Sequence, residues 1–162
     1  MKHPEKSLPP CVSGCCPPER IPDAETFARL QQNPLPETLS WQALHPLQEA
    51  PRFTYGIAQL QYGQQVLDIA VHKWYSLFAP VRVEWRQEQP RALAFRNWQT
   101  QEREAFGTAF TLLEPDWLIQ KPDPDIPVSQ LLLRDLDDEE FARFSFFQPE
   151  NIGEIVFNDW AK

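Results

Sequence analysis

The fold is decided by residues 64–98, which read QQVLDIAVHKWYSLFAPVRVEWRQEQPRALAFRNW. When the first half is plotted at about 100° per residue, its polar side chains form one narrow stripe and apolar side chains cover the remaining circumference. This pattern predicts one long amphipathic helix from Gln64 to Ala79, which Pro80 ends. Apolar and polar residues then alternate in Val81–Arg86 and Ala92–Trp98, which predicts a strand pair joined by a hairpin loop.

The rest of the chain favours an α+β fold. Phe53, Tyr55 and Ile57 alternate along the chain, which predicts a strand near residues 53–60. We therefore expect a small antiparallel sheet, with its hairpin near residues 81–98, packed by amphipathic helices. Apolar spacing places these further helices near residues 24–32, 36–47, 100–113, 141–147 and 149–160.

Length and charge restrict the class of protein. A chain of 162 residues suits one domain, which we place at residues 23–162. The net charge is −8, and residues 91–162 carry fourteen acids against seven bases. This acidic part would repel a phosphate backbone, so we expect no nucleic-acid partner. Because the sequence has no apolar run of about 18 residues and no secretory signal, we expect no membrane span and a cytoplasmic location.

Proline and cysteine are concentrated near the N-terminus. Residues 1–22 hold six of the seventeen prolines and all three cysteines, which predicts a flexible tail. An odd number of closely spaced cysteines is no disulfide framework, so free thiols in a reducing compartment are one interpretation. The alternative is that Cys11, Cys15 and Cys16 bind one soft cation, Zn²⁺ or Cu⁺, with His3 as a fourth ligand.

One short resemblance lies in this segment. The run from Cys11 to Cys15 is similar to the C-x-S-G-C element of the oxidoreductase-like N-terminal segment, over about six residues. Pro17 and Pro18 stand where that element has its next cysteine. We therefore infer no activity from the resemblance.

A catalytic interpretation depends on Asp68, His72 and Ser76, which are spaced four residues apart. On a helix they would share one face, and a small hydrolase or lyase using His72 with nearby carboxylates is the resulting alternative. The polar stripe of an amphipathic helix explains the same spacing without any chemistry, and we assign no catalytic residue. Phosphate-binding loops are absent from the sequence, and we expect no cofactor.

The C-terminal region points to binding. Phe146, Phe147, Phe157 and Trp160 are crowded into the last residues, beside an acidic stretch. Aromatic residues are enriched at the centres of protein interfaces, so we predict that these four contact a partner. We interpret the chain as a non-catalytic soluble protein that binds another protein with a basic surface. Its expected role is to help assemble or stabilise a complex.

Overall fold

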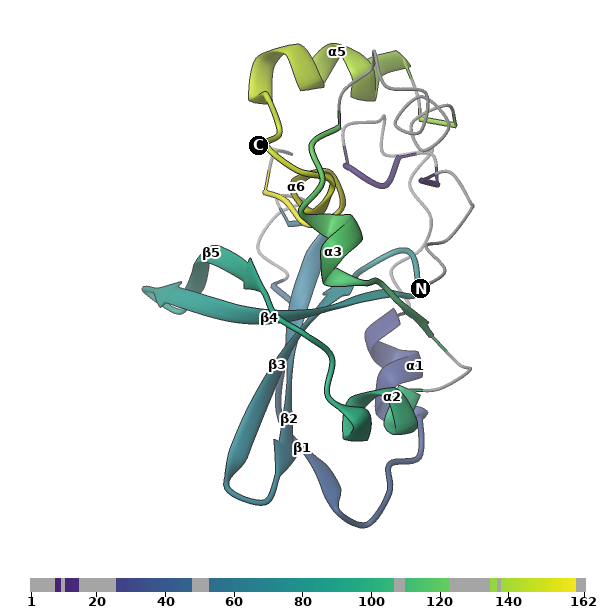
Figure 1. Cartoon of the computed structure of the whole chain (residues 1–162), viewed down its shortest axis with the longest axis vertical. Coiled ribbons are helices and arrows are strands. Elements are labelled where there is room, and N and C mark those ends of the chain that lie inside the picture. Colours follow the sequence, from purple (N-terminus) through teal and green to yellow (C-terminus); the bar gives the residue numbers. More distant parts are fainter. Residues whose placement is uncertain are drawn as a thin grey trace.

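The computed structural model of this protein describes residues 8–9, 11–14, 26–47, 53–106, 110–122, 135–136 and 138–159. At its centre is an antiparallel meander in the order β1-β2-β3-β4-β5, and β6 pairs in parallel with the start of β4 (Figure 1). The strands are β1 (Leu39–His45), β2 (Tyr55–Tyr62), β3 (Gln65–His72), β4 (Leu77–Arg86), β5 (Gln89–Phe95) and β6 (Thr111–Leu112). The helices are α1 (Thr26–Gln32), α2 (Thr100–Phe106), α3 (Pro115–Leu118), α5 (Asp138–Phe147) and α6 (Ile152–Val156).

The long helix predicted for Gln64 to Ala79 is wrong. Those residues form β3, a loop and the first part of β4. A two-residue turn at Gly63 and Gln64 joins β2 to β3, and Gly63 has the positive φ (+58°) that such hairpin turns require. The sequence misled because β3 is buried on both faces from Ile69 to His72, so apolar residues occupy both sides of this part of the strand and little alternation remains.

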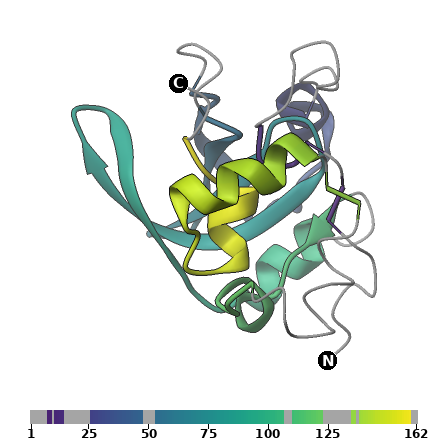
Figure 2. The same cartoon turned by 90° about the horizontal axis from the view of Figure 1, so that it is seen from above.

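Two clusters of buried side chains lie on opposite faces of the sheet, because neighbouring residues of a strand point to opposite sides. Leu67, Ile69 and Val71 of β3 belong to one cluster, which α1 and α2 cover with Leu30 and Phe106. Ala70 of β3 belongs to the other cluster, which also holds side chains of α3 and α6. Figure 2 shows α5 crossing above α6 over this second face.

The predicted hairpin near residues 81–98 and the strand near residues 53–60 are confirmed as β4–β5 and β2. The mixed α+β class is also confirmed, although the sheet is larger than predicted. The helix expected at 36–47 is wrong, since β1 occupies that region, and the helix that begins at Thr100 ends at Phe106. The β4–β5 hairpin extends away from the other elements in both views (Figures 1 and 2).

The N-terminal segment contributes to the core at the few positions that the structure describes. Leu8 and Val12 are buried in the same cluster as the α6 residues, and Cys11, Ser13 and Gly14 are buried beside them. The domain boundary at residue 23 stays a prediction. Among the described helices, none has the length and apolar character needed to cross a membrane.

Candidate functional site

The aromatic residues predicted to contact a partner lie in different environments. Phe146 is 76% exposed in the last turn of α5, and its ring lies 4.9 Å from that of Phe147, measured between centroids. Phe147 is half-buried and lines a pocket that Phe157 also lines. Phe157 is only 5% exposed and belongs to the core. Trp160 lies outside the described residues.

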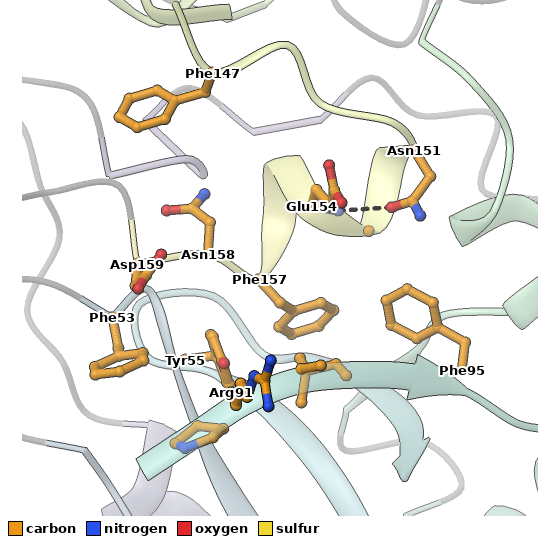
Figure 3. A pocket seen from close by; sticks show the side chains of 14 residues that line it. Phe53, Tyr55, Arg91, Phe95, Phe147, Asn151, Glu154, Phe157, Asn158 and Asp159 are labelled. Carbon is orange, nitrogen blue, oxygen red and sulfur yellow. Dashed lines mark hydrogen bonds between the residues drawn. The ribbon is translucent and has the colours of Figure 1, made fainter. Parts of the chain in front are cut away.

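This pocket, which we call the β5–α6 pocket, opens between β5, α6 and the end of α5 (Figure 3). Its volume is about 410 Å³, within the range of roughly 300–1,000 Å³ that is usual for binding sites. Three distant parts of the chain form it: the start of β2, β5, and residues 147–159. Its aromatic lining residues are Phe53, Tyr55, Phe95, Phe147 and Phe157, and its charged ones are Arg91, Glu154 and Asp159.

The floor of the β5–α6 pocket is a set of packed rings. Tyr55 meets Phe157 edge to face, with 5.9 Å between centroids and 88° between ring planes. Phe53 meets Tyr55 in the same way at 5.7 Å and 89°, and Phe95 lies 6.5 Å from Phe157. Edge-to-face pairs are favourable because the positive edge of one ring meets the negative face of the other. The floor is therefore held in place before any ligand arrives.

Hydrogen bonds from Thr54 fix the segment that follows α6. The Thr54 backbone N–H donates to the Asn158 carbonyl at 3.0 Å, and the Thr54 hydroxyl donates to the Val156 carbonyl at 2.7 Å. The Asn158 N–H donates in turn to the Thr54 hydroxyl oxygen at 3.0 Å. Phe157 is thereby held over β2 by the residues on either side of it.

Close approach to β5 determines the position of α6. A Cβ atom on Gly153 would lie 2.3 Å from the ring of Phe95, so only glycine permits this contact. Asn151 caps the helix by accepting the Glu154 N–H at 2.9 Å, and Glu154 accepts the Glu150 N–H at 2.6 Å. The N-cap bond from Asn151 satisfies an N–H group that the start of the helix leaves without a helical partner, and Glu154 reaches back to the residue before the N-cap.

The charges of the β5–α6 pocket are mostly negative. Glu154 and Asp159 line it with Arg91, and Arg91 lies 3.4 Å from Glu84. Burial, with a further contribution from the negative charge of Asp159, raises the pKa of Tyr55 above its usual range. Tyr55 therefore keeps its proton at neutral pH and cannot serve as a base. The arrangement suits recognition of an apolar group next to a cation.

His72, the residue of the catalytic alternative, lies on the same face of the sheet but is 0% exposed. Its Nε2 bonds to the Val12 carbonyl at 2.8 Å, and its Nδ1 accepts the N–H groups of Trp74 and Tyr75, both at 3.2 Å. Burial lowers the pKa of His72 to about 4. The imidazole is therefore neutral near pH 7, with both ring nitrogens engaged and no contact with solvent.

The predicted alignment of Asp68, His72 and Ser76 is not formed. Asp68 and His72 lie on one strand, four residues or about 13 Å apart at roughly 3.3 Å per residue. The Asp68 carboxylate accepts from Gln59 at 3.1 Å, and the Ser76 hydroxyl, in the loop after β3, accepts from Arg29. Each of these three side chains has a separate structural partner, so they do not form a nucleophile–base pair with one another.

A buried carboxylate holds the loop at residues 11–14, which we call the N-terminal loop. Glu140 on α5 is 0% exposed. It accepts the Cys11 N–H at 2.5 Å, the Ser13 N–H at 3.0 Å and the Ser13 hydroxyl at 2.5 Å. With the bond from His72 to Val12, every residue from 11 to 13 is attached to the core. In the sequence, nothing in the acidic run distinguishes Glu140 from Asp138 and Glu139, which are exposed.

The predicted metal site rests largely on Cys15 and Cys16, which lie outside the described residues. Cys11 is disulfide-bonded and buried. A sulfur in a disulfide is not a thiolate ligand, so metal binding by this segment would require its reduction. Within the described part of the chain, no group of three or more histidine, cysteine, aspartate or glutamate residues could hold a metal. Disulfides are rare in a reducing cytoplasm, so this one does not favour the cytoplasmic location. That location stays a prediction.

Comparisons of this chain with protein-family models, with curated proteins and with solved structures give no match. The functional argument therefore depends on the geometry of the chain itself. Of the four predicted partner-binding residues, the structure places Phe147 and Phe157 at one pocket and Phe146 beside it. Tyr55, Phe95 and Gly153 of that pocket are not identified from the sequence, because only the fold brings β2 and β5 beside α6.

Proposed function

We propose that the protein is non-catalytic and binds another protein through the β5–α6 pocket. The observation that carries this proposal is an open, aromatic-floored pocket directly beside Phe146, a phenylalanine that is 76% exposed. A large apolar side chain that is this exposed gains stability when a partner covers it, at roughly 25 cal/mol per Å² of apolar surface. Aromatic anchors at the centre of an interface carry much of the binding energy.

The partner is expected to present a basic surface. Glu154 and Asp159 line the pocket, and the chain as a whole carries a net charge of −8. Opposite charges on a partner would accelerate its approach and select against acidic competitors. Within this proposal the protein acts by holding its partner, as an assembly or stability factor for a complex does. The cytoplasmic location belongs to the proposal as well.

The test is affinity capture with the full chain, followed by measurement of the dissociation constant for the captured protein. The deciding variant is the double substitution Phe146→Ala, Phe147→Ala, which removes the rings at the edge of the pocket. We expect it to weaken binding at least tenfold, the effect of about 1.4 kcal/mol. Circular dichroism of both proteins verifies that the variant is folded.

Ile119→Ala is the matched control, because Ile119 is also an exposed apolar residue, at 60%, and does not line the pocket. It should bind like the unaltered protein. Equal affinities for the unaltered protein and the double variant would overturn the proposal, whatever protein was captured. Equal losses in the double variant and the control would indicate nonspecific apolar adsorption, which would overturn it too.

A further inference from the structure

The side of β5 that faces away from β4 adjoins the β5–α6 pocket. β5 is the last strand of the sheet and pairs with β4 alone among the described strands. Pro90, Arg91, Ala92, Leu93 and Phe95 of this strand line the pocket. The pocket therefore adjoins a strand edge, and an edge strand can pair with another chain.

The register shows which backbone groups face outward. The Arg96 N–H donates to the Pro80 carbonyl at 3.0 Å, which marks that pair as hydrogen-bonded. Hydrogen-bonded and non-hydrogen-bonded pairs alternate in an antiparallel ladder. The N–H and carbonyl groups of Ala94 (opposite Arg82) and Ala92 (opposite Glu84) therefore point toward β4. Those of Leu93 and Phe95 point away from it.

The edge at residues 92–95 has few of the features that prevent strand pairing. Natural edges are protected by charged side chains, prolines and bulges. Here Pro90 and the irregularity opposite Glu84 and Trp85 lie toward the hairpin tip. The sequence that remains, Ala-Leu-Ala-Phe at 92–95, has no charge and no proline. Arg91 precedes this stretch, and Arg96 follows it with its guanidinium paired to Glu102 at 2.7 Å.

Side chains of an added strand would alternate between the two faces of the sheet. A residue paired with Leu93 or Phe95 would point to the same face as these residues, over the β5–α6 pocket. That face offers aromatic rings for one apolar side chain, and Glu154 and Asp159 for a neighbouring cation. The positive charge of Arg91 does not reverse this preference for a cation, because the carboxylate of Glu84 lies 3.4 Å from it and offsets that charge.

We propose that β5 accepts an extended peptide segment of the partner protein as an added strand. One apolar side chain of the segment enters the β5–α6 pocket, and a lysine or arginine lies beside Glu154 and Asp159. This inference rests on the proposed function and names how the partner binds. Backbone hydrogen bonds to Leu93 and Phe95 supply affinity, and the pocket supplies specificity.

The test begins with randomised peptides of about ten residues, displayed on phage and selected on the full chain; this length can pair along all of β5 at roughly 3.4 Å per residue. We expect selected peptides to alternate apolar and polar residues and to carry a lysine or arginine near the central apolar residue. The tightest peptide is then synthesised with single N-methyl groups along its backbone. Each single methyl group at one of the alternate positions whose N–H faces β5 should weaken binding about tenfold or more, because it removes a hydrogen bond to the strand. Methylation at the positions between should have little effect.

A second measurement uses Asp159→Asn with the selected peptide and its Lys→Met analogue. The variant should weaken binding of the lysine peptide several-fold and leave that of the methionine peptide nearly unchanged. Failure to select any peptide would overturn strand addition. So would methyl groups that weaken binding equally at neighbouring positions of the peptide. If captured protein still depends on Phe146 and Phe147 in that case, the proposed function stands and only the binding mode is wrong. If the peptide binds with the expected alternation but no captured protein depends on those rings, the use of the pocket by a protein is wrong.

Discussion

The N-terminal loop and the β5–α6 pocket lie against the same face of the sheet, yet their polar groups differ in environment. Beside the loop, Glu140 of α5 and His72 of β3 are 0% exposed, and each makes at least two hydrogen bonds to the backbone. In the pocket, Arg91 is exposed and Glu154 and Asp159 are partly exposed. Thr54 lies between the two regions, since it is close to Gly14 and also bonds to the residues around Phe157.

The difference separates what stabilises the protein from what is available to a ligand. A buried carboxylate is tolerated only where hydrogen bonds replace its water, and the loss of such a partner is costly. A polar group that remains in water costs little and can exchange its water for a ligand. We therefore expect substitutions at the loop to change stability and substitutions at the pocket to change binding.

The largest effect is expected for Glu140→Ala. This substitution leaves the N–H groups of Cys11 and Ser13 and the Ser13 hydroxyl without their buried acceptor. The unfolding free energy should fall by about 3 kcal/mol or more, measured by urea denaturation. Glu139→Ala is the control: Glu139 is exposed on the same turn of α5, so the change should be below about 1 kcal/mol. Equal effects would show that Glu140 does not anchor the loop.

The next effect is a dependence of stability on pH through His72. Its pKa is about 4 in the folded protein and 6.5 in the reference state, because burial opposes the charged form. The unfolded chain therefore binds more protons between these values, so stability is complete above about pH 6.5 and decreases as the pH falls toward 4. The total loss from this group is about 3 kcal/mol.

The measurement compares urea denaturation at pH 6.5 and pH 5, above the range in which most carboxylates titrate. The unaltered protein should lose stability at close to 1.4 kcal/mol per pH unit in the lower part of this range. His72→Gln should remove most of this slope while lowering stability at pH 7. A variant with the slope of the unaltered protein would show that another group causes the pH dependence.

Local patterns predicted the elements that have one exposed face. Val81 and Val83 alternate with Arg82 and Glu84, so the β4–β5 hairpin could be recognised from the sequence. β3 could not, because both faces of its second half are buried and its apolar run matches a buried helix equally well. Hydrophobic spacing carries no information on which partner a buried polar residue finds, so Glu140 and His72 were not identified as anchors. The β5–α6 pocket depends on contacts between distant segments, and only the crowding of Phe147 and Phe157 hinted at it.

A smaller effect is expected for Gly153→Ala, which lies where the pocket meets the core. The new methyl group would lie 2.3 Å from the ring of Phe95, so α6 or that ring must move. Overpacking costs about 1–3 kcal/mol, and the higher helix propensity of alanine returns up to about 1 kcal/mol. We expect a net loss of about 1 kcal/mol in thermal denaturation, with weaker partner binding because the Phe95 ring moves. In a Phe95→Leu background the same substitution should cost less, and an unchanged cost would mean that the contact with Phe95 is not the cause.

The smallest effect on stability is expected for Phe146→Ala, although it belongs to the variant that should reduce binding most. Phe146 is 76% exposed, and its described ring contact is with Phe147. Alanine is a better helix former than phenylalanine by a few tenths of a kcal/mol, which offsets the loss of that contact. The unfolding free energy should therefore change by no more than about 0.5 kcal/mol. A loss of 2 kcal/mol or more, of the size expected for a core phenylalanine, would show that the ring supports the fold. It would then remove the distinction between a loop that stabilises the protein and a pocket that binds a partner.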